Sequence, residues 1–172
     1  GVGKSTLIKL LLGEYSASKG TIHTGTKIEV AYFDQSRAAL DQEMTVNEAI
    51  GAGRDFIEIN GQSIHVVSYL KRFMFDSAQS RGKIRTLSGG QQNRLLMAQL
   101  FAQPANLLIL DEPTNDLDVE TLELLETLLH EYSGTVLLVS HDRRFLDEVV
   151  TSLLVFKGEG QVEEQIGGFS EW

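Results

Sequence analysis

The sequence predicts an α/β domain, and three observations support this prediction. Two short apolar runs, Leu107–Leu110 and Thr135–Val139, have the composition of strands buried on both faces, as strands of a parallel sheet are. Segments with helical periodicity separate these runs, so strands and helices alternate along the chain. A glycine-containing turn, Gly1–Thr6, precedes the first helical segment, and a helix that begins in this way can bind an anion at its N-terminus.

The first 50 residues predict a helix, a hairpin and a second, short helix. The first helix is expected over Lys4–Leu12. Residues 20–34 alternate between polar and apolar, which predicts an antiparallel β-hairpin. Thr45 is a candidate N-cap, with Glu48 at the spacing of a capping box, for a helix that runs to Ile50.

A second hairpin is predicted over Phe56–Ile64, because Asn60-Gly61 between alternating apolar residues is a strong signal for a tight turn. The apolar residues from Val66 to Met74 then recur at helical spacing. Residues 36–86 are therefore expected to form a small, largely helical subdomain inserted into the α/β core. Together with the helix that follows, this subdomain extends to about residue 103.

The second half of the chain predicts the rest of the core. A helix begins near Gly90 and ends near Gln103, and Leu107–Leu110 then forms a central parallel strand. An amphipathic helix over Glu120–Tyr132 leads to the second buried strand. A terminal hairpin is expected from Leu153 to Glu164.

Composition limits the function classes. The chain has 172 residues, 42% of them hydrophobic, which is enough for one globular domain. It has no cysteine, so disulfides and thiolate metal sites are excluded. No apolar run approaches the roughly 20 residues that a membrane-spanning helix needs. The net charge of −9 argues against a surface that coats DNA.

One segment is basic although the chain as a whole is acidic. Its positive charges have a single acidic neighbour in the sequence, Asp76. Such a segment either contacts RNA or is an ordinary solvated surface, and the sequence leaves both interpretations open. The basic residues are Lys71, Arg72, Arg81, Lys83 and Arg85.

Four motifs occur in the order found in the nucleotide-binding domain of the ATP-binding cassette (ABC) family, which the chain resembles. Together they are far more specific than any one alone, and the resemblance covers essentially the whole chain. It implies an ABC-type P-loop NTPase fold and an ATPase with ATP and Mg²⁺ as cofactors. The motifs are the phosphate loop Gly1-Val2-Gly3-Lys4-Ser5-Thr6, the signature motif Leu87-Ser88-Gly89-Gly90-Gln91-Gln92, the acidic pair Asp111-Glu112 before Pro113, and Ser140-His141-Asp142.

The phosphate loop is expected to hold ATP. Gly3 allows the backbone to close on phosphate, Lys4 would bridge the β- and γ-phosphates, Ser5 would ligate Mg²⁺, and Thr6 would help to hold the phosphates. Gly1 and Val2 belong to the same cradle. Taken alone, the same residues are also compatible with an ordinary glycine turn that opens a helix.

Only the second half of the pattern Gly-x-x-x-x-Gly-Lys-Ser/Thr is present, and no initiator Met precedes it. We therefore expect an N-terminally truncated cassette, without the first half of the loop and the strand that leads into it.

The acidic pair is expected to carry the hydrolysis. A carboxylate at the end of a buried strand is costly unless it is paired or binds a metal, so Asp111 is assigned to Mg²⁺. Glu112 would orient and deprotonate the attacking water. The alternative is a solvated strand end.

Four further assignments follow from the resemblance alone. It implies that Gln35 senses Mg²⁺ and the attacking water, and that His141 acts at the γ-phosphate. It also implies that Ser88, Gly89 and Gly90 contact a nucleotide held by a second cassette, so that one cassette is active only when paired. Asp116 and Asp118 would help to couple the two halves, although Asp118 equally fits an N-cap of the following helix. Gln35 could also be a surface residue and His141 a structural histidine.

The segments Glu112–Asp118 and Ser140–Asp147 resemble the ABC-F branch of the family, and residues 60–76 most resemble the second cassette of its Uup-type members. This resemblance implies a cytoplasmic, ribosome-associated factor in translation or ribosome assembly, whose partners are a second cassette and ribosomal RNA. Two alternatives remain: the cassette of an ABC transporter, and a DNA-maintenance ATPase with DNA as partner. The second alternative fits less well, because such ATPases place long coiled coils between the two halves of the motif set.

Overall fold

The computed structural model describes residues 3–25, 27–34 and 38–171. They divide into two compact units, one made of Gly1–Ile28 with Val139–Trp172 and the other of Glu29–Leu138.

The second unit is built on a three-stranded sheet. Its strands are β1 (Val30–Asp34), β4 (Leu107–Asp111) and β5 (Thr135–Val139), in the order β1-β4-β5. The pairing of β1 with β4 is parallel, and its register sets Asp34 opposite Asp111. Leu107–Leu110 is buried throughout, which confirms the prediction of a central parallel strand.

The predicted antiparallel hairpin over residues 20–34 is wrong. Among the described residues of this segment, only β1 is a strand, and it pairs in parallel with β4. Ala31 and Phe33 are buried while Tyr32 between them is exposed. The alternation thus identified a strand with one buried face, but alternation carries no information about the partner strand.

The β5 prediction needs a smaller correction. Thr135–Val139 forms a strand as expected, but its residues are half-buried or exposed. The strand lies at the end of the described sheet, so only one of its sides has a neighbour.

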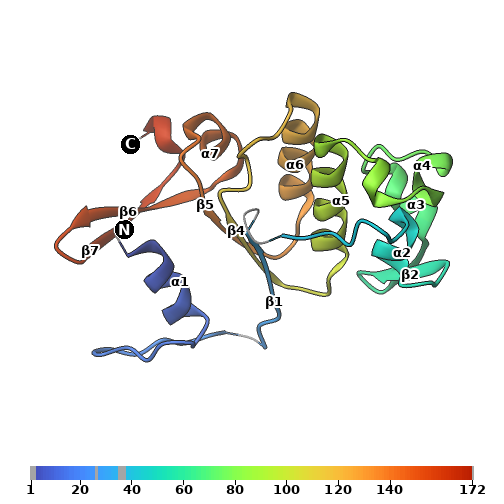
Figure 1. Ribbon diagram of the computed structural model, residues 1–172. Helices are drawn as coiled ribbons and strands as arrows, with labels where there is room; N and C mark the ends of the chain where they lie inside the picture. The colour runs from blue at the N-terminus through green and yellow to red at the C-terminus, as the bar shows by residue number, and fades with distance from the viewer. Residues whose placement is uncertain (1–2, 26, 35–37, 172) are drawn as a thin grey trace. The chain divides into compact units, whose positions relative to one another are not determined.

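Two helices pack together beside this sheet, α5 (Gly89–Ala102) and α6 (Val119–Glu131), as Figure 1 shows. Helix α5 contacts β1 and also the subdomain, and it is buried on most of its circumference. The core around the sheet is made of aliphatic side chains: Leu95, Ala98, Leu108, Ile109, Leu110, Leu125 and Leu129.

The subdomain between β1 and α5 contains the predicted second hairpin and short helices. Asn60 and Gly61, at its turn, have φ of 52° and 76°, as a tight hairpin turn requires. Helix α3 ends at Lys71, earlier than the predicted Met74, whose φ of 64° is outside the helical range. The elements are α2 (Val46–Gly51), β2 (Phe56–Ile59), β3 (Gln62–His65), α3 (Val66–Lys71), α4 (Ser77–Arg81) and the 3₁₀-helix η1 (Ile84–Thr86).

The first unit contains the N-terminal helix and the C-terminal elements. The predicted terminal hairpin is confirmed, as the antiparallel pair β6–β7. In the described residues, no helix is long and apolar enough to cross a membrane. The elements are α1 (Lys4–Leu11), α7 (Arg143–Val149), β6 (Ser152–Gly158), β7 (Gln161–Ile166) and the 3₁₀-helix η2 (Phe169–Glu171).

Candidate nucleotide site

The described part of the phosphate loop has the backbone that anion binding requires. Gly3 caps α1 with φ 97° and ψ 7°, a left-handed conformation that favours glycine. Lys4 is the first helical residue, and Ser5 and Thr6 are exposed in the first turn. The N–H groups of a first helical turn have no partner within the helix, so they are available to phosphate oxygens. Gly1 and Val2 lie outside the described residues.

His141 belongs to the same unit and is held between β5 and α7. The Ser140 hydroxyl accepts a hydrogen bond from the Asp142 N–H at 3.0 Å. The Asp142 carboxylate in turn accepts one from the Phe145 N–H at 3.0 Å and so caps α7. These two bonds fix the backbone on both sides of His141, whose side chain is exposed.

The acidic pair lies at the C-terminal end of β4, in the other unit. Asp111 is the last strand residue, and Glu112 follows with φ 48°, a left-handed value that is uncommon for a residue with a side chain. Strained backbone of this kind is often found at functional sites. The Tyr32 hydroxyl of β1 donates to Asp111 Oδ2 at 3.3 Å, which is a long bond. Gln35, expected nearby, lies outside the described residues.

The signature turn (Ser88–Gly90) opens α5 with a reciprocal capping box. Ser88 Oγ accepts the Gln91 N–H at 3.2 Å, and Gln91 Oε1 accepts the Ser88 N–H at 2.8 Å. The N–H groups of Gly89 and Gly90 have no carbonyl to bond within the helix, because they belong to its first turn. The predicted accessible helix N-terminus is therefore present.

Asp118 connects this turn to α6. Its carboxylate caps α6 by accepting the Thr121 N–H at 2.8 Å, which confirms the predicted N-cap. A Cβ atom at Gly90 would lie 2.5 Å from Asp118 Oδ2, so a side chain at this position would displace the Asp118 carboxylate. Hydrogen bonding by Thr121, and to a smaller extent the positive charge of Arg94, lowers the pKa of the Asp118 carboxyl.

One cleft of about 800 Å³ brings several of these residues together, and this volume is in the usual range for a ligand site. The acidic pair and the signature turn both contribute to its lining, although the resemblance assigns them to two different nucleotides. The residues around it include Asp34, Gly89, Gly90, Asp111, Glu112 and Asp116.

Two of the predicted Mg²⁺ ligands are described, one in each unit: the Ser5 hydroxyl in the first turn of α1 and the Asp111 carboxylate at the end of β4. Both offer oxygen atoms, which Mg²⁺ prefers, so the chemistry of each residue fits its predicted role. The described residues contain no group of three His, Asp or Glu side chains that could hold a metal by themselves.

The basic segment is more strongly neutralised than the sequence indicates. Lys83 and Arg85 lie 3.1 and 3.8 Å from the carboxylate of Glu43, and Arg72 lies 3.4 Å from Glu131. Within the described residues, Lys71 and Arg81 make no ion pair, and both are exposed.

Sequence reasoning missed three residues near the site, Tyr32, Glu43 and Arg94. Arg94 is only 8% exposed, with its guanidinium 6.0 Å from the centre of the Phe75 ring. Tyr32 and Glu43 reach their partners across 79 and 40 residues of sequence. No local pattern signals such contacts, although a basic residue at a helical position that is otherwise apolar, as Arg94 is, does indicate a special environment.

Comparison with known proteins supports the motif-based assignment. The model of the ABC transporter family matches residues 1–115. The ATP-binding protein Uup of Escherichia coli (strain K12) is 54% identical over 171 residues, which are 99% of this chain and 27% of Uup. The energy-dependent translational throttle protein EttA of the same strain is 40% identical over 172 residues, 100% of this chain and 31% of EttA.

A solved structure is similar as well. In the crystal structure of an archaeal ribosomal stalk protein with the archaeal ribosome recycling factor aABCE1, one chain matches with a TM-score of 0.64 and 28% identity. The match covers 98% of this chain and 33% of that one. The relatives confirm the expected ABC-F resemblance and its Uup-type character, and the chain spans about a third or less of each of these proteins.

Proposed function

Because this chain belongs to the ABC transporter family, we propose that it is one ATP-hydrolysing cassette of a two-cassette ABC-F protein that acts on the ribosome in the cytoplasm. The observation that carries this proposal is the end of β4. There Asp111 and Glu112 follow a buried strand and line an open cleft, and the backbone of Glu112 has a left-handed φ of 48°.

Each motif has a separate task in this proposal. Lys4 and the first-turn N–H groups of α1 bind the β- and γ-phosphates. Ser5 and Asp111 are the protein ligands of Mg²⁺, which when bound neutralises charge on the phosphate oxygens. Glu112 accepts a proton from the attacking water, and His141 and Gln35 orient the reacting groups.

The signature turn serves the nucleotide of the opposite cassette. Gly89 and Gly90 present two free N–H groups at the start of a 14-residue helix, which is a favourable arrangement for an oxyanion. The turn lies between the subdomain and α5, which contact each other through α2 and β2.

The ribosome is the proposed partner for two reasons. EttA is named a translational throttle protein, and aABCE1 is named a ribosome recycling factor. In addition, Lys71 and Arg81 are exposed and have no described ion pair, so they are the members of the basic segment best placed to contact RNA phosphates.

The test replaces Glu112 with Gln in the two-cassette protein, which keeps the shape of the side chain and removes its basicity. Phosphate release should fall by roughly 100-fold or more while ATP still binds, because only proton transfer is lost. The ATP-bound variant should then accumulate on ribosomes in sucrose gradients. Lys71→Glu with Arg81→Glu should reduce that association, and Lys19→Glu, at an exposed position outside the basic segment, is the control.

The outcomes separate the parts of the proposal. Unchanged phosphate release in Glu112→Gln would show that another residue is the base. If Glu112→Gln lost turnover as expected but did not associate with ribosomes, the ATPase assignment would stand. The ribosome would then be refuted as the partner.

A further inference from the structure

Two segments that are distant in sequence form a short antiparallel ladder directly before the signature turn. We refer to residues 41–46 and 82–87 as the pre-signature clasp. Its first segment leads into α2, and its second segment ends at Leu87, next to Ser88. The ladder consists of three hydrogen bonds, Val46 N–H to Gly82 C=O (3.0 Å), Ile84 N–H to Met44 C=O (3.0 Å) and Arg85 N–H to Gln42 C=O (3.2 Å).

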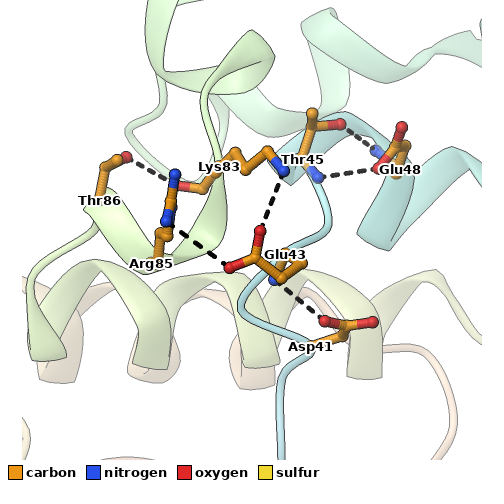
Figure 2. Close-up of polar contacts among 7 residues, drawn as sticks. All are labelled: Asp41, Glu43, Thr45, Glu48, Lys83, Arg85 and Thr86. Carbon is orange, nitrogen blue, oxygen red and sulfur yellow. Dashed lines mark hydrogen bonds and ion pairs between the residues drawn. The ribbon is translucent and has the colours of Figure 1, made fainter.

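Glu43 adds a charged contact to the clasp, as Figure 2 shows. One carboxylate oxygen lies 3.1 Å from Lys83 Nζ and the other 3.8 Å from an Arg85 guanidinium nitrogen. The Glu43 N–H donates to Asp41 Oδ1 at 3.0 Å, which fixes the backbone that carries the carboxylate. All three charged side chains are about half exposed, and exposed ion pairs contribute little to folding stability. Their effect is therefore on position.

Gln92 connects the clasp to the first turn of α5. Its side-chain amide exchanges two hydrogen bonds with that of Gln42, at 3.3 and 3.4 Å. Gln92 Nε2 also lies 3.5 Å from the Ile84 carbonyl and 3.4 Å from the Leu87 carbonyl. These bonds are long, and one NH₂ group has two hydrogens to share among three acceptors. Together they still connect both clasp segments to the helix that begins with the signature turn.

We propose that Glu43 is a positioning residue for the signature turn. It holds Lys83 and Arg85 against the first clasp segment, and this fixes the path of the chain into Leu87 and Ser88. The Gln42–Gln92 pair fixes the first turn of α5 from the other side. The N–H groups of Gly89 and Gly90 are thereby held in one orientation before any nucleotide arrives. This inference rests on the proposed function of the signature turn.

The proposal also assigns Lys83 and Arg85 a role within the fold. A basic residue whose charge is engaged by a carboxylate of the same chain is a weak candidate for RNA contact. The mutation of Lys83 alone should therefore alter ATP turnover more than ribosome association.

The test uses charge reversal and charge exchange in the two-cassette protein. Glu43→Lys should repel Lys83 and Arg85 and lower kcat by about fivefold, while ATP affinity stays within about twofold, because a positioning contact matters only in the assembled active state. Combining Glu43→Lys with Lys83→Glu and Arg85→Glu should restore most of kcat. Glu131→Lys is the matched control, because Glu131 forms an ion pair of similar length and exposure with Arg72, away from the signature turn.

Salt supplies a second readout. Exposed charges are screened at high ionic strength, so the difference in kcat between Glu43→Lys and the parent protein should shrink between low and high salt. Glu43→Gln removes the attraction without adding repulsion, so it provides the test if Glu43→Lys fails to fold. Its kcat should fall by a smaller factor, roughly twofold.

Several results would overturn the proposal. Unchanged kcat in both Glu43 variants would show that the contact has no role in turnover. Equal losses of kcat and ATP affinity, or no recovery on charge exchange, would show that the variants act through general damage. If Glu112→Gln retained full turnover, the assignment of Glu112 as the base in the proposed function would fail instead, and this result is independent of Glu43.

Discussion

The N-cap of α6 allows a quantitative prediction about the stability of the first turn of this helix. Asp118 is the N-cap of this helix, and its carboxylate accepts the Thr121 N–H at 2.8 Å. Replacing an N-cap Asp with Ala costs about 1 kcal/mol, whereas Asn caps about as well as Asp. Asp118→Ala should therefore loosen the first turn of α6, and Asp118→Asn, which keeps the cap and loses only the charge, should loosen it less.

Hydrogen exchange measured by mass spectrometry reports this loosening locally, in the complete protein. A cost of about 1 kcal/mol corresponds to about fivefold faster exchange of the amides in the first turn of α6. The expected order is Asp118→Ala fastest, with Asp118→Asn between it and the parent protein. Equal acceleration in both variants would show that the charge, and not the cap, holds the turn.

Gly90→Ala should produce the same local signature from a different helix. The new Cβ would lie 2.5 Å from Asp118 Oδ2, so the carboxylate should rotate away, which weakens the bond that its other oxygen, Oδ1, accepts from the Thr121 N–H. Alanine is also favoured over glycine within a helix by about 1 kcal/mol, so overall stability should change little. If the amides in the first turn of α6 exchanged at the parent rate in Gly90→Ala, the claim that a Cβ at this position disturbs the Asp118 cap would be refuted.

The pH dependence of the cap has a definite sign. The pKa of Asp118 is lowered in the folded protein, mainly by hydrogen bonding with Thr121, so folding favours the charged carboxylate. Its contribution is complete above the unfolded pKa of about 3.9 and is lost as pH falls through the lower folded value. Exchange measured near neutral pH therefore reports the full effect.

Two further substitutions test single hydroxyl groups. Tyr32→Phe removes the hydroxyl that donates to the Asp111 carboxylate. If that bond orients the carboxylate, the affinity of the nucleotide-bound protein for Mn²⁺ should weaken by up to about tenfold. An unchanged affinity would mean that the 3.3 Å bond is incidental. Tyr69→Phe removes a buried bond of 2.7 Å to the Ala98 carbonyl and should destabilise the protein by about 1 kcal/mol in urea unfolding. Burial raises the pKa of Tyr69, so this effect should not vary between pH 6 and 9.

Features set by neighbouring residues could be predicted from the sequence. The capping box of Thr45 with Glu48, the Asn60-Gly61 turn and the Asp118 cap are all present, because each depends on at most four consecutive residues. The buried run of β4 was equally clear, since uniform apolar composition reports burial on both faces.

Features set by distant residues could not be predicted in this way. The strand pattern of Val30–Asp34 did not reveal that its partner is β4, and a partner within the same hairpin was the wrong choice. The Glu43 ion pairs and the Tyr32 contact depend on how the chain folds back on itself. The candidate site lies between these cases, because its motifs are local but the roles of Lys4, Gln35, Glu112 and His141 depend on an assembled nucleotide site and remain predictions.

Helix α5 also determines how the subdomain can move. It is roughly 21 Å long at 1.5 Å per residue, and it buries side chains against both β1 and the subdomain. Sliding along either neighbour would break close-packed contacts, and interiors of this kind resist gradual deformation. Any rearrangement of the subdomain should therefore carry α5 with it as one body and repack the contact between α5 and β1 in a single step. The dihedral changes on the C-terminal side of that body should then be concentrated after the helix, at Gln103.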